Sequence, residues 1–435
     1  MKKKRILALL LAASMSLSLA ACGGGDKPSD NTPAGNTETP GGSTAAQTEI
    51  TWWAFPTFGV DSGYEQEVAE AFMGANPDVK VNIETIDFTA GPDKLTAAIS
   101  AGTAPDVLFD APGRIIEYGN AGYLAPLDDM MEALKDDLAN ENLVETCVGA
   151  DGTAYMYPIS SSPFYMGLNK EALEEANALQ YVNLEGDRTW TTENFVKMCE
   201  ALAAAGATTV PGIVYCGGQG GDQGTRALVN NLFSSSIVGE DGKWNIDANG
   251  VKALEQLKAM YDAGSLDAGF DMAAADELQK FQQETAAMTF CWGTSNAKSY
   301  ASEDFTQISV PFPSDDGKPE LEYLVNGFCV FNNKDDAKID AAKRLIAFIC
   351  DDAEWGPKSV KQSGAFPSRT SFGNLYEGDG EMSLLASWIG YYGPYYNTRA
   401  GFATMRTEWW NMLQRVFQEG DVQAQVDIFN TNANA

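Results

Sequence analysis

Histidine is absent from all 435 residues of the chain. Its absence excludes the usual Ser-His-Asp and Cys-His catalytic arrangements, and also histidine-ligated zinc. Seven cysteines are present, but none forms a Cys-x-x-Cys pair, so neither a thiolate zinc site nor a thioredoxin-type redox motif is supported. All but Cys22 lie in apolar runs, where we expect buried thiols rather than disulfides.

Positive charge is also scarce. The chain has 29 Lys and Arg against 60 Asp and Glu, a net charge of −31. Such an acidic surface disfavours nucleic acid and anionic lipid as partners. Beyond residue 21 no apolar run approaches the length that crosses a membrane.

The first 22 residues predict export and lipid anchoring. Residues 1–5 are basic, residues 6–19 form an apolar run, and small residues precede Cys22. We expect residues 1–21 to be a lipoprotein signal peptide and Cys22 to become a lipidated N-terminus. An ordinary secretory signal followed by a chance cysteine is the alternative.

A low-complexity segment follows the signal. Residues 23–48 contain no aromatic residue and no Leu, Ile, Val or Met. Such a composition cannot bury enough apolar surface to fold, so residues 22–48 are expected to be a lipidated, disordered tether.

The remainder predicts an α/β fold. Apolar runs at 50–55 and 105–110 read as strands, and helical patterns alternate with them. Capping residues mark other helices: Thr191 or Thr192 begins one that ends at Gly206, and Asp247 begins one that ends at Gly264. About 390 residues exceed one ordinary domain, so two lobes are expected.

Ligands of open α/β sheets bind beyond the carboxyl ends of strands. This rule selects Trp53 and Phe55 after the first strand, and Asp110 and Arg114 after the later one. Core packing is the alternative for the aromatic pair, and a helix cap with a solvated base is the alternative for the charged pair.

Several stretches occur in an order typical of one family. They are 50–55 (ITWWAF), 101–108 (AGTAPDVL), 122–128 (GYLAPLD), 157–165 (YPISSSPFY), 189–191 (TWT), 286–288 (AAM) and 364–367 (GAFP). In this order the chain resembles extracellular solute-binding proteins of ABC importers, in the sugar-binding, maltose-binding-protein-like class. The Gly-rich loop at 217–222 and the aromatic cluster at 391–396 do not match the family pattern.

The resemblance implies two lobes joined by three crossings, near Pro158, Trp292 and residues 326–328. The lobes would comprise residues 49–158 with 291–328, and residues 159–290 with 329–435. A hinge between them would close over the ligand. Cleft positions implied by the crossings are Ser162, Tyr165, Trp292 and Asn326.

A sugar offers apolar ring faces and a polar rim, which suit aromatic side chains, carboxylates and arginine. The cluster at 391–396 adds Tyr396, with Arg399 nearby; these residues would stack a ligand or pack a C-terminal lid. Paired tyrosines also resemble the ligands of ferric-ion receptors, although no histidine supports a metal site. Asp222 and Arg226 could line the cleft, or form a turn and a helix cap.

We therefore expect a binding protein, not an enzyme, that captures an oligosaccharide and delivers it to a membrane permease. No cofactor is expected. The protein would be a monomer on the surface of a Gram-positive cell, where its lipid is the only membrane anchor. The alternatives are a surface glycoside hydrolase with two carboxylates, and an adhesive lipoprotein.

Overall fold

The computed structural model describes residues 47–55, 63–87, 90–206, 209–218 and 220–435. The expected signal peptide, Cys22 and the expected tether up to residue 46 lie outside the described residues. The first strand begins at Thr48, two residues earlier than the strand that the sequence predicts at 50–55.

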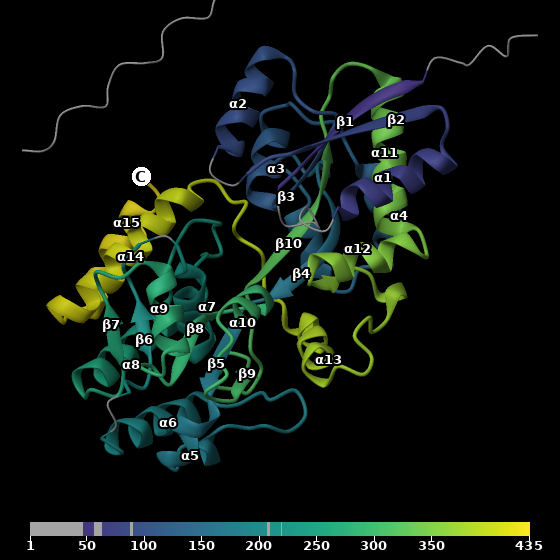
Figure 1. Cartoon of the computed structure of the whole chain (residues 1–435). Helices are drawn as coiled ribbons and strands as arrows, with labels where there is room; N and C mark the ends of the chain where they lie inside the picture. Colours follow the sequence, from purple (N-terminus) through teal and green to yellow (C-terminus); the bar gives the residue numbers. More distant parts are fainter. Residues whose placement is uncertain (1–46, 56–62, 88–89, 207–208, 219) are drawn as a thin grey trace, which may run out of the picture. The chain divides into compact units, whose positions relative to one another are not determined.

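A six-stranded sheet has the order β11-β4-β10-β3-β1-β2 (Figure 1). Its strands are β1 (Thr48–Ala54), β2 (Val79–Thr85), β3 (Val107–Asp110), β4 (Tyr157–Pro163), β10 (Tyr323–Val330) and β11 (Phe366–Pro367). β1 pairs in parallel with β2 and β3, whereas β10 runs antiparallel to β3 and β4. The carboxyl ends of β1 and β3 therefore share one edge of this sheet.

Helices cover this sheet and are visible around it in Figure 1. α1 contacts β2, α11 contacts β1, α3 contacts β10 and α12 contacts β4. Their bounds are α1 (Tyr64–Ala75), α3 (Pro112–Asn120), α11 (Asp336–Asp351) and α12 (Trp355–Ser363), with α2 (Gly91–Ala101), α4 (Asp128–Leu134), η2 (Glu141–Thr146) and η4 (Thr370–Phe372) in the connections. None of the helices in the described part of the chain is long and apolar enough to cross a membrane.

A second group of strands comprises the three-stranded sheet β8-β5-β9 and the parallel pair β6-β7. The strands are β5 (Tyr165–Asn169), β6 (Ile213–Tyr215), β7 (Asp267–Gly269), β8 (Met288–Trp292) and β9 (Gln307–Val310). The helices here are α5 (Lys170–Glu175), η3 (Leu179–Tyr181), α6 (Thr192–Ala204), α7 (Asp222–Leu232), α8 (Ala248–Asp262), α9 (Ala274–Gln282) and α10 (Thr294–Ser299). The side chains of Thr191 and Asp247 cap α6 and α8, as the sequence predicts.

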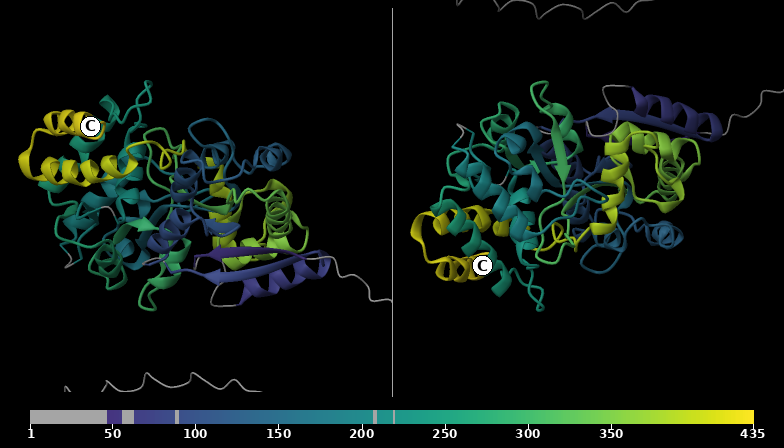
Figure 2. Two further views of the ribbon diagram at one scale, coloured as in Figure 1. Left: turned by 90° about the horizontal axis from the view of Figure 1, so that it is seen from above. Right: turned by 90° about the horizontal axis from the view of Figure 1, so that it is seen from below.

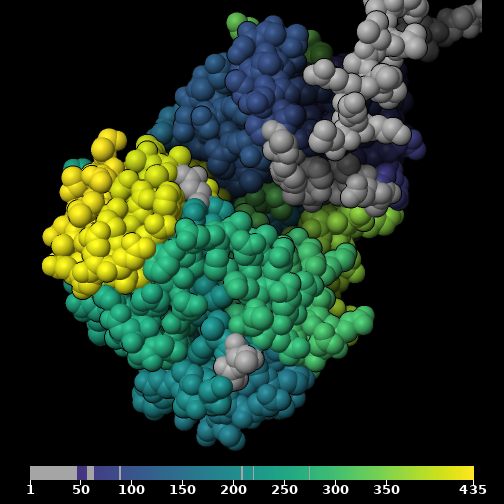
Figure 3. Space-filling view, turned by 60° about the vertical axis from the view of Figure 1, so that its left-hand side comes forward, coloured from purple at the N-terminus to yellow at the C-terminus, as the bar shows by residue number. Residues whose placement is uncertain are grey.

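The last two helices belong to this second group. α14 (Phe402–Glu419) and α15 (Val422–Asn432) lie side by side in both views of Figure 2 and pack against α8. In the space-filling view they form the yellow surface, which adjoins the teal and green surface of the middle of the chain (Figure 3). α14 also contacts α7, which brings the C-terminal region to the strand ends of this group.

Three connections join the two groups of strands. β4 passes into β5 through Phe164, β9 passes into β10 through residues 311–322, and β11 leads to α14 through α13 (Gly380–Ser387) and η5 (Trp388–Tyr391). β10 shifts register between Asn326 and Gly327. A side chain at Gly327 would lie 2.5 Å from the Tyr157 carbonyl oxygen, so only glycine fits there.

The strand pairing differs from the expected lobe boundaries. Residues 291–328 are expected beside the first strand, yet Trp292 of β8 and the whole of β9 pair with β5. Residues 329–435 were expected in the other lobe, yet the end of β10 pairs with β3, β11 pairs with β4, and α11 packs on β1. An apolar run predicts that a strand is buried. It does not specify which strand is its partner, because a buried strand can pair with any neighbouring strand of a sheet.

Candidate functional site

A first cluster of side chains lies where β1 and β3 end. It consists of Phe55, Asp110 and Arg114. The Arg114 guanidinium donates two hydrogen bonds to the Asp110 carboxylate, from Nε at 2.6 Å and from Nη2 at 2.5 Å. Asp110 is the last residue of β3 and Arg114 lies in the first turn of α3, so the short strand-to-helix connection brings the two side chains together. The centre of the Phe55 ring lies 4.6 Å from the same guanidinium and helps to hold it in place.

The ionisation of this pair is set by burial and mutual attraction. Asp110 is 3% exposed, and burial raises the pKa of its carboxyl although Arg114 partly opposes the shift. Burial alone would lower the pKa of Arg114, but the bonds to Asp110 outweigh it and raise the pKa. The Arg114 side chain is 36% exposed and therefore presents part of a fixed guanidinium to solvent.

A second cluster lies at the amino end of α7, just beyond β6. It consists of Asp222, Arg226, Phe402 and Arg406. Arg406 of α14 donates to Asp222 from Nε at 2.8 Å and from Nη2 at 2.7 Å, and its guanidinium lies 5.6 Å from the Phe402 ring. Arg226 forms a second, very short ion pair with the same carboxylate. The Arg406 side chain is 28% exposed, whereas Asp222 is buried.

Close packing fixes the position of α7. A side chain at Gly224 would lie 2.2 Å from the Phe290 carbonyl oxygen, so α7 approaches β8 as closely as glycine allows. The Trp409 indole N–H donates to the Thr225 hydroxyl at 2.9 Å and ties α14 to α7. The second cluster is thus built on two helices and a strand end that cannot shift independently.

Arg226 links the second cluster to the chain crossings. Its guanidinium donates to Glu322 at 3.0 Å and to the Tyr396 hydroxyl at 3.2 Å. The Tyr396 hydroxyl also forms a very short hydrogen bond with Glu322. Burial would lower the pKa of Arg226, but Glu322, Tyr396 and Asp222 together raise it.

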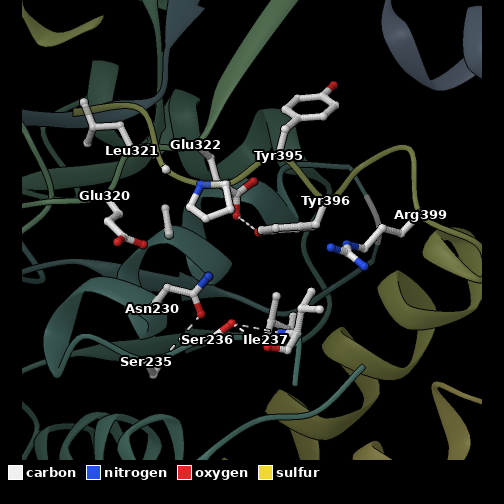
Figure 4. A pocket seen from close by; sticks show the side chains of 14 residues that line it. Asn230, Ser235, Ser236, Ile237, Glu320, Leu321, Glu322, Tyr395, Tyr396 and Arg399 are labelled. Atoms are coloured by element: carbon white, nitrogen blue, oxygen red, sulfur yellow. Dashed lines mark hydrogen bonds between the residues drawn. The ribbon is translucent and has the colours of Figure 1, made fainter. Parts of the chain in front are cut away.

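A pocket adjoins this network, and we call it the hinge pocket. It contains about 530 Å³ of empty space, part of it open to solvent. In Figure 4 the Tyr396 hydroxyl points at Glu322, Tyr395 turns away, and Arg399 lies beside Tyr396. Its lining residues are Ala227, Asn230, Ser235, Ser236, Ile237, Val238, Glu320, Leu321, Glu322, Gly393, Pro394, Tyr395, Tyr396 and Arg399.

A family model described as bacterial extracellular solute-binding protein matches residues 67–383, which is most of the chain. The chain belongs to this family. Its members are binding proteins that act outside the cytoplasm, which confirms the class that the sequence motifs indicate.

Solved structures confirm the fold of this solute-binding protein. The sugar-binding protein MalE of Xanthomonas citri superposes with a TM-score of 0.73 at 18% identity, covering 89% of this chain and 96% of that one. The cyclic alpha-maltosyl-1,6-maltose binding protein of Arthrobacter globiformis gives 0.73 at 17% identity, covering 89% and 98%. The protein therefore has the two-lobed α/β fold of periplasmic binding proteins.

Curated relatives match over shorter segments. A maltooligosaccharide ABC transporter solute-binding lipoprotein of Streptococcus pneumoniae is 30% identical over 181 residues, 40% of this chain and 37% of that protein. A protein of Brucella abortus named as a binding protein is 33% identical over 116 residues, 26% of this chain and 27% of that protein. The alignments thus span well under half the length of these relatives.

Some residues expected in the cleft of this solute-binding protein are in the core. Trp292 is fully buried and meets Phe281 edge to face at 5.2 Å, and Tyr165 is fully buried against Trp388. Neither ring has a face that a ligand could reach in this conformation. Trp53 is buried as well, and Lys94 covers its ring at 4.9 Å. Alternation places a strand residue on one face of a sheet, but here helices cover both faces.

The remaining expected residues lie at the crossings. Ser162 is half-buried at the end of β4, and Asn326 is half-buried at the register shift of β10. Tyr396 and Arg399 line the hinge pocket, and Tyr396 reaches the second cluster through Arg226 and through its ring, whose centre lies 6.4 Å from that of Phe402. Tyr392 packs internally: its ring stacks on a neighbouring tyrosine ring at 4.0 Å, and its hydroxyl donates to a serine hydroxyl at 3.0 Å.

Sequence reasoning does not identify Phe402 and Arg406. Their spacing of four residues on one helix face is visible in the sequence, but a pair four apart on an amphipathic helix is usually a surface feature. Only the approach of α14 to α7 brings Arg406 to Asp222. Asp222 and Arg226, which the sequence allows as a turn and a cap, do belong to the second cluster.

Proposed function

We propose that this solute-binding protein captures a carbohydrate between the first and second clusters and delivers it to the permease of an ABC importer. The observation that carries the proposal is that each cluster stands at a strand or helix end and presents a partly exposed arginine held by a buried aspartate. Carbohydrate hydroxyls bind well to such fixed, charge-assisted groups. The family and the maltose-related names of several similar proteins support this class of ligand.

The two clusters would form opposite walls of the ligand cleft. In this proposal one lobe is built on the six-stranded sheet with α11 and α12, and the other on β5 to β9 with α14 and α15. The three crossings form the hinge, and closure brings Arg114 and Arg406 to opposite sides of the ligand. A ligand that contacts both walls binds the closed form better and shifts the population toward it.

The protein would perform no chemistry on the ligand. The buried carboxyl groups of the two clusters and the hinge, on Asp110, Asp222 and Glu322, are all ion-paired with arginine. Both oxygens of each of these carboxyl groups accept from arginine or tyrosine donors of the protein itself. These side chains are therefore suited to holding arginines in place rather than to cleaving a glycosidic bond.

Calorimetric titration and thermal unfolding of the mature protein with maltotriose and other oligosaccharides test this function. Binding raises the unfolding temperature by an amount set by the ratio of ligand concentration to Kd. Chromatography of the recovered sugar should show it unchanged. Steady hydrolysis would refute a pure receptor, and failure of every carbohydrate to bind would refute the ligand class.

A variant pair locates the site. Arg114→Gln removes a guanidinium from the first cluster and should weaken binding, whereas Arg344→Gln removes one from the α11 surface and should not. A result in which both variants bind like wild type would exclude the first cluster from the cleft.

The position of the protein in the cell is part of the same proposal. Cys22 would carry the lipid, and the protein would be a monomer on a Gram-positive cell surface. The tether expected after Cys22 would raise the effective concentration of the protein beside the permease.

A further inference from the structure

We infer that the ligand is an uncharged carbohydrate rather than a uronate, sulfated or phosphorylated one. This inference rests on the proposed function and narrows its substrate class. The structure bears on it because the partly exposed arginines of both clusters are already neutralised by carboxylates of the protein itself.

The first cluster is electrically balanced. Both Asp110 oxygens accept from Arg114, and the Phe55 ring lies against the guanidinium. Of the five N–H groups of an arginine, this arrangement uses two for the carboxylate and leaves three for neutral acceptors. The ammonium of Lys94, which lies over the Trp53 ring, is likewise paired with a carboxylate.

The second cluster is balanced by a chain of alternating charges. Arg406 pairs with Asp222, Asp222 also pairs with Arg226, and Arg226 pairs with Glu322. Two cations thus face two anions. Arg226 is 2% exposed, so it cannot turn toward a ligand without breaking this chain.

An anionic sugar would have to compete with these internal carboxylates. Its own carboxylate could approach Arg114 or Arg406 only beside Asp110 or Asp222, and like charges within a few ångströms repel strongly in a partly buried site. The whole chain adds to this repulsion with its net charge of −31. A neutral hydroxyl meets no such penalty, because it can accept from the arginine without bringing a second negative charge beside the aspartate.

Single substitutions that release one arginine test the inference. Asp110→Asn keeps the shape of the side chain and removes the charge paired with Arg114, and Asp222→Asn removes the charge paired with Arg406 while Arg226 keeps Glu322. Calorimetric titrations compare neutral and acidic ligands: maltotriose, cellotriose and xylotriose against trigalacturonate and a hyaluronan tetrasaccharide. Circular dichroism establishes that each variant is folded, and because Asp222 is the more deeply buried of the two, a folded Asp110→Asn variant is sufficient for the test.

The wild-type protein should bind a neutral ligand, with a Kd that hardly changes with salt, and should bind neither acidic ligand. Asp110→Asn should improve the ratio of acidic to neutral affinity by about tenfold or more, because one charge-assisted hydrogen bond changes an affinity by about that factor. The control Asp78→Asn makes the same charge change beside Arg344, at the amino end of β2, and should leave the ratio unchanged.

The outcomes distinguish failure of the inference from failure of the proposed function. Wild-type binding of trigalacturonate or hyaluronan at least as tight as of the neutral sugars overturns the inference and leaves a carbohydrate receptor. An unchanged ratio in a folded Asp110→Asn variant also overturns it. Binding of no carbohydrate at all overturns the proposed function, and the inference falls with it.

Discussion

Glu277 provides a stability prediction that is independent of the ligand. This residue of α9 is 1% exposed, and its two carboxyl oxygens are hydrogen-bonded to the Thr289 hydroxyl at 2.6 Å and the Phe290 backbone N–H at 2.8 Å. Burial raises the pKa of Glu277 to about 7, and the two hydrogen bonds offset only part of that shift. The Glu277→Gln variant replaces the acid by an amide of the same shape, whose oxygen can accept from the Phe290 N–H and whose nitrogen can donate to the Thr289 hydroxyl oxygen.

The sign of the pH dependence follows from linkage. The folded protein holds the Glu277 proton up to about pH 7, whereas the unfolded chain releases it near 4.5. The contribution of this group to stability is therefore full below the unfolded value and is lost as pH rises through the folded one. At about 1.4 kcal/mol per pKa unit, a shift of roughly 2.5 units costs the wild-type protein about 3 kcal/mol above neutral pH.

Urea unfolding of both proteins, at one pH below and one above this window, measures the effect. Wild type and Glu277→Gln should have similar free energies of unfolding in acid, and the variant should be more stable by about 3 kcal/mol in mild alkali. The control Glu255→Gln alters an exposed carboxyl of α8 and should show no such divergence. If the free energy of unfolding changes equally with pH in wild type and in Glu277→Gln, the claim that this carboxyl titrates while buried is refuted.

Three further substitutions test other parts of the structure. Tyr396→Phe removes the hydroxyl shared by Glu322 and Arg226 and should lower the free energy of unfolding by about 1–2 kcal/mol in denaturant unfolding. The control Tyr391→Phe removes a hydroxyl that bonds to Asp187 near the surface and should lower the free energy of unfolding by less. Arg406→Met should weaken carbohydrate binding about tenfold in calorimetric titration, with Arg344→Met as the unaffected control. Cys22→Ala should release the protein from membranes into the medium, as blotting of cell fractions would show, because the lipid is its proposed anchor.

Local physical rules predicted the elements of the fold. Thr191 and Asp247 were recognisable as helix caps because a short polar side chain must satisfy the first free backbone N–H groups. The six cysteines after Cys22 were expected as buried thiols from their apolar neighbours, and all six are free and buried. The identity of strand partners is not local information, and the pairing of β9 and of the segment after residue 328 differs from the expected lobe boundaries.

Tyr396 shows how a local pattern can suggest a different role from the one that packing gives. Its aromatic surroundings in the sequence suited a sugar that stacks on tyrosine rings. In the structure its hydroxyl is bonded to Arg226 and Glu322, which come from two other segments of the chain. The residue therefore joins Glu322, in the connection between β9 and β10, to the second cluster, a role that no pattern within 391–396 could indicate.

The same distinction explains why only half of the candidate site was predicted. Asp110 ends β3 and Arg114 lies in the first turn of α3, so one short strand-to-helix connection brings them together and the strand-end rule selects both from the sequence. Asp222 and Arg406 are 184 residues apart, and they meet only because α7 approaches β8 closely and α14 is tied to α7. If the two clusters are the two walls of the ligand site, the first wall comes mainly from one short segment of the sequence. The second wall depends on the packing of three elements, α7, β8 and α14. Substitutions remote from the ligand that disturb the packing of α7 or α14 should therefore damage the second wall while leaving the first intact.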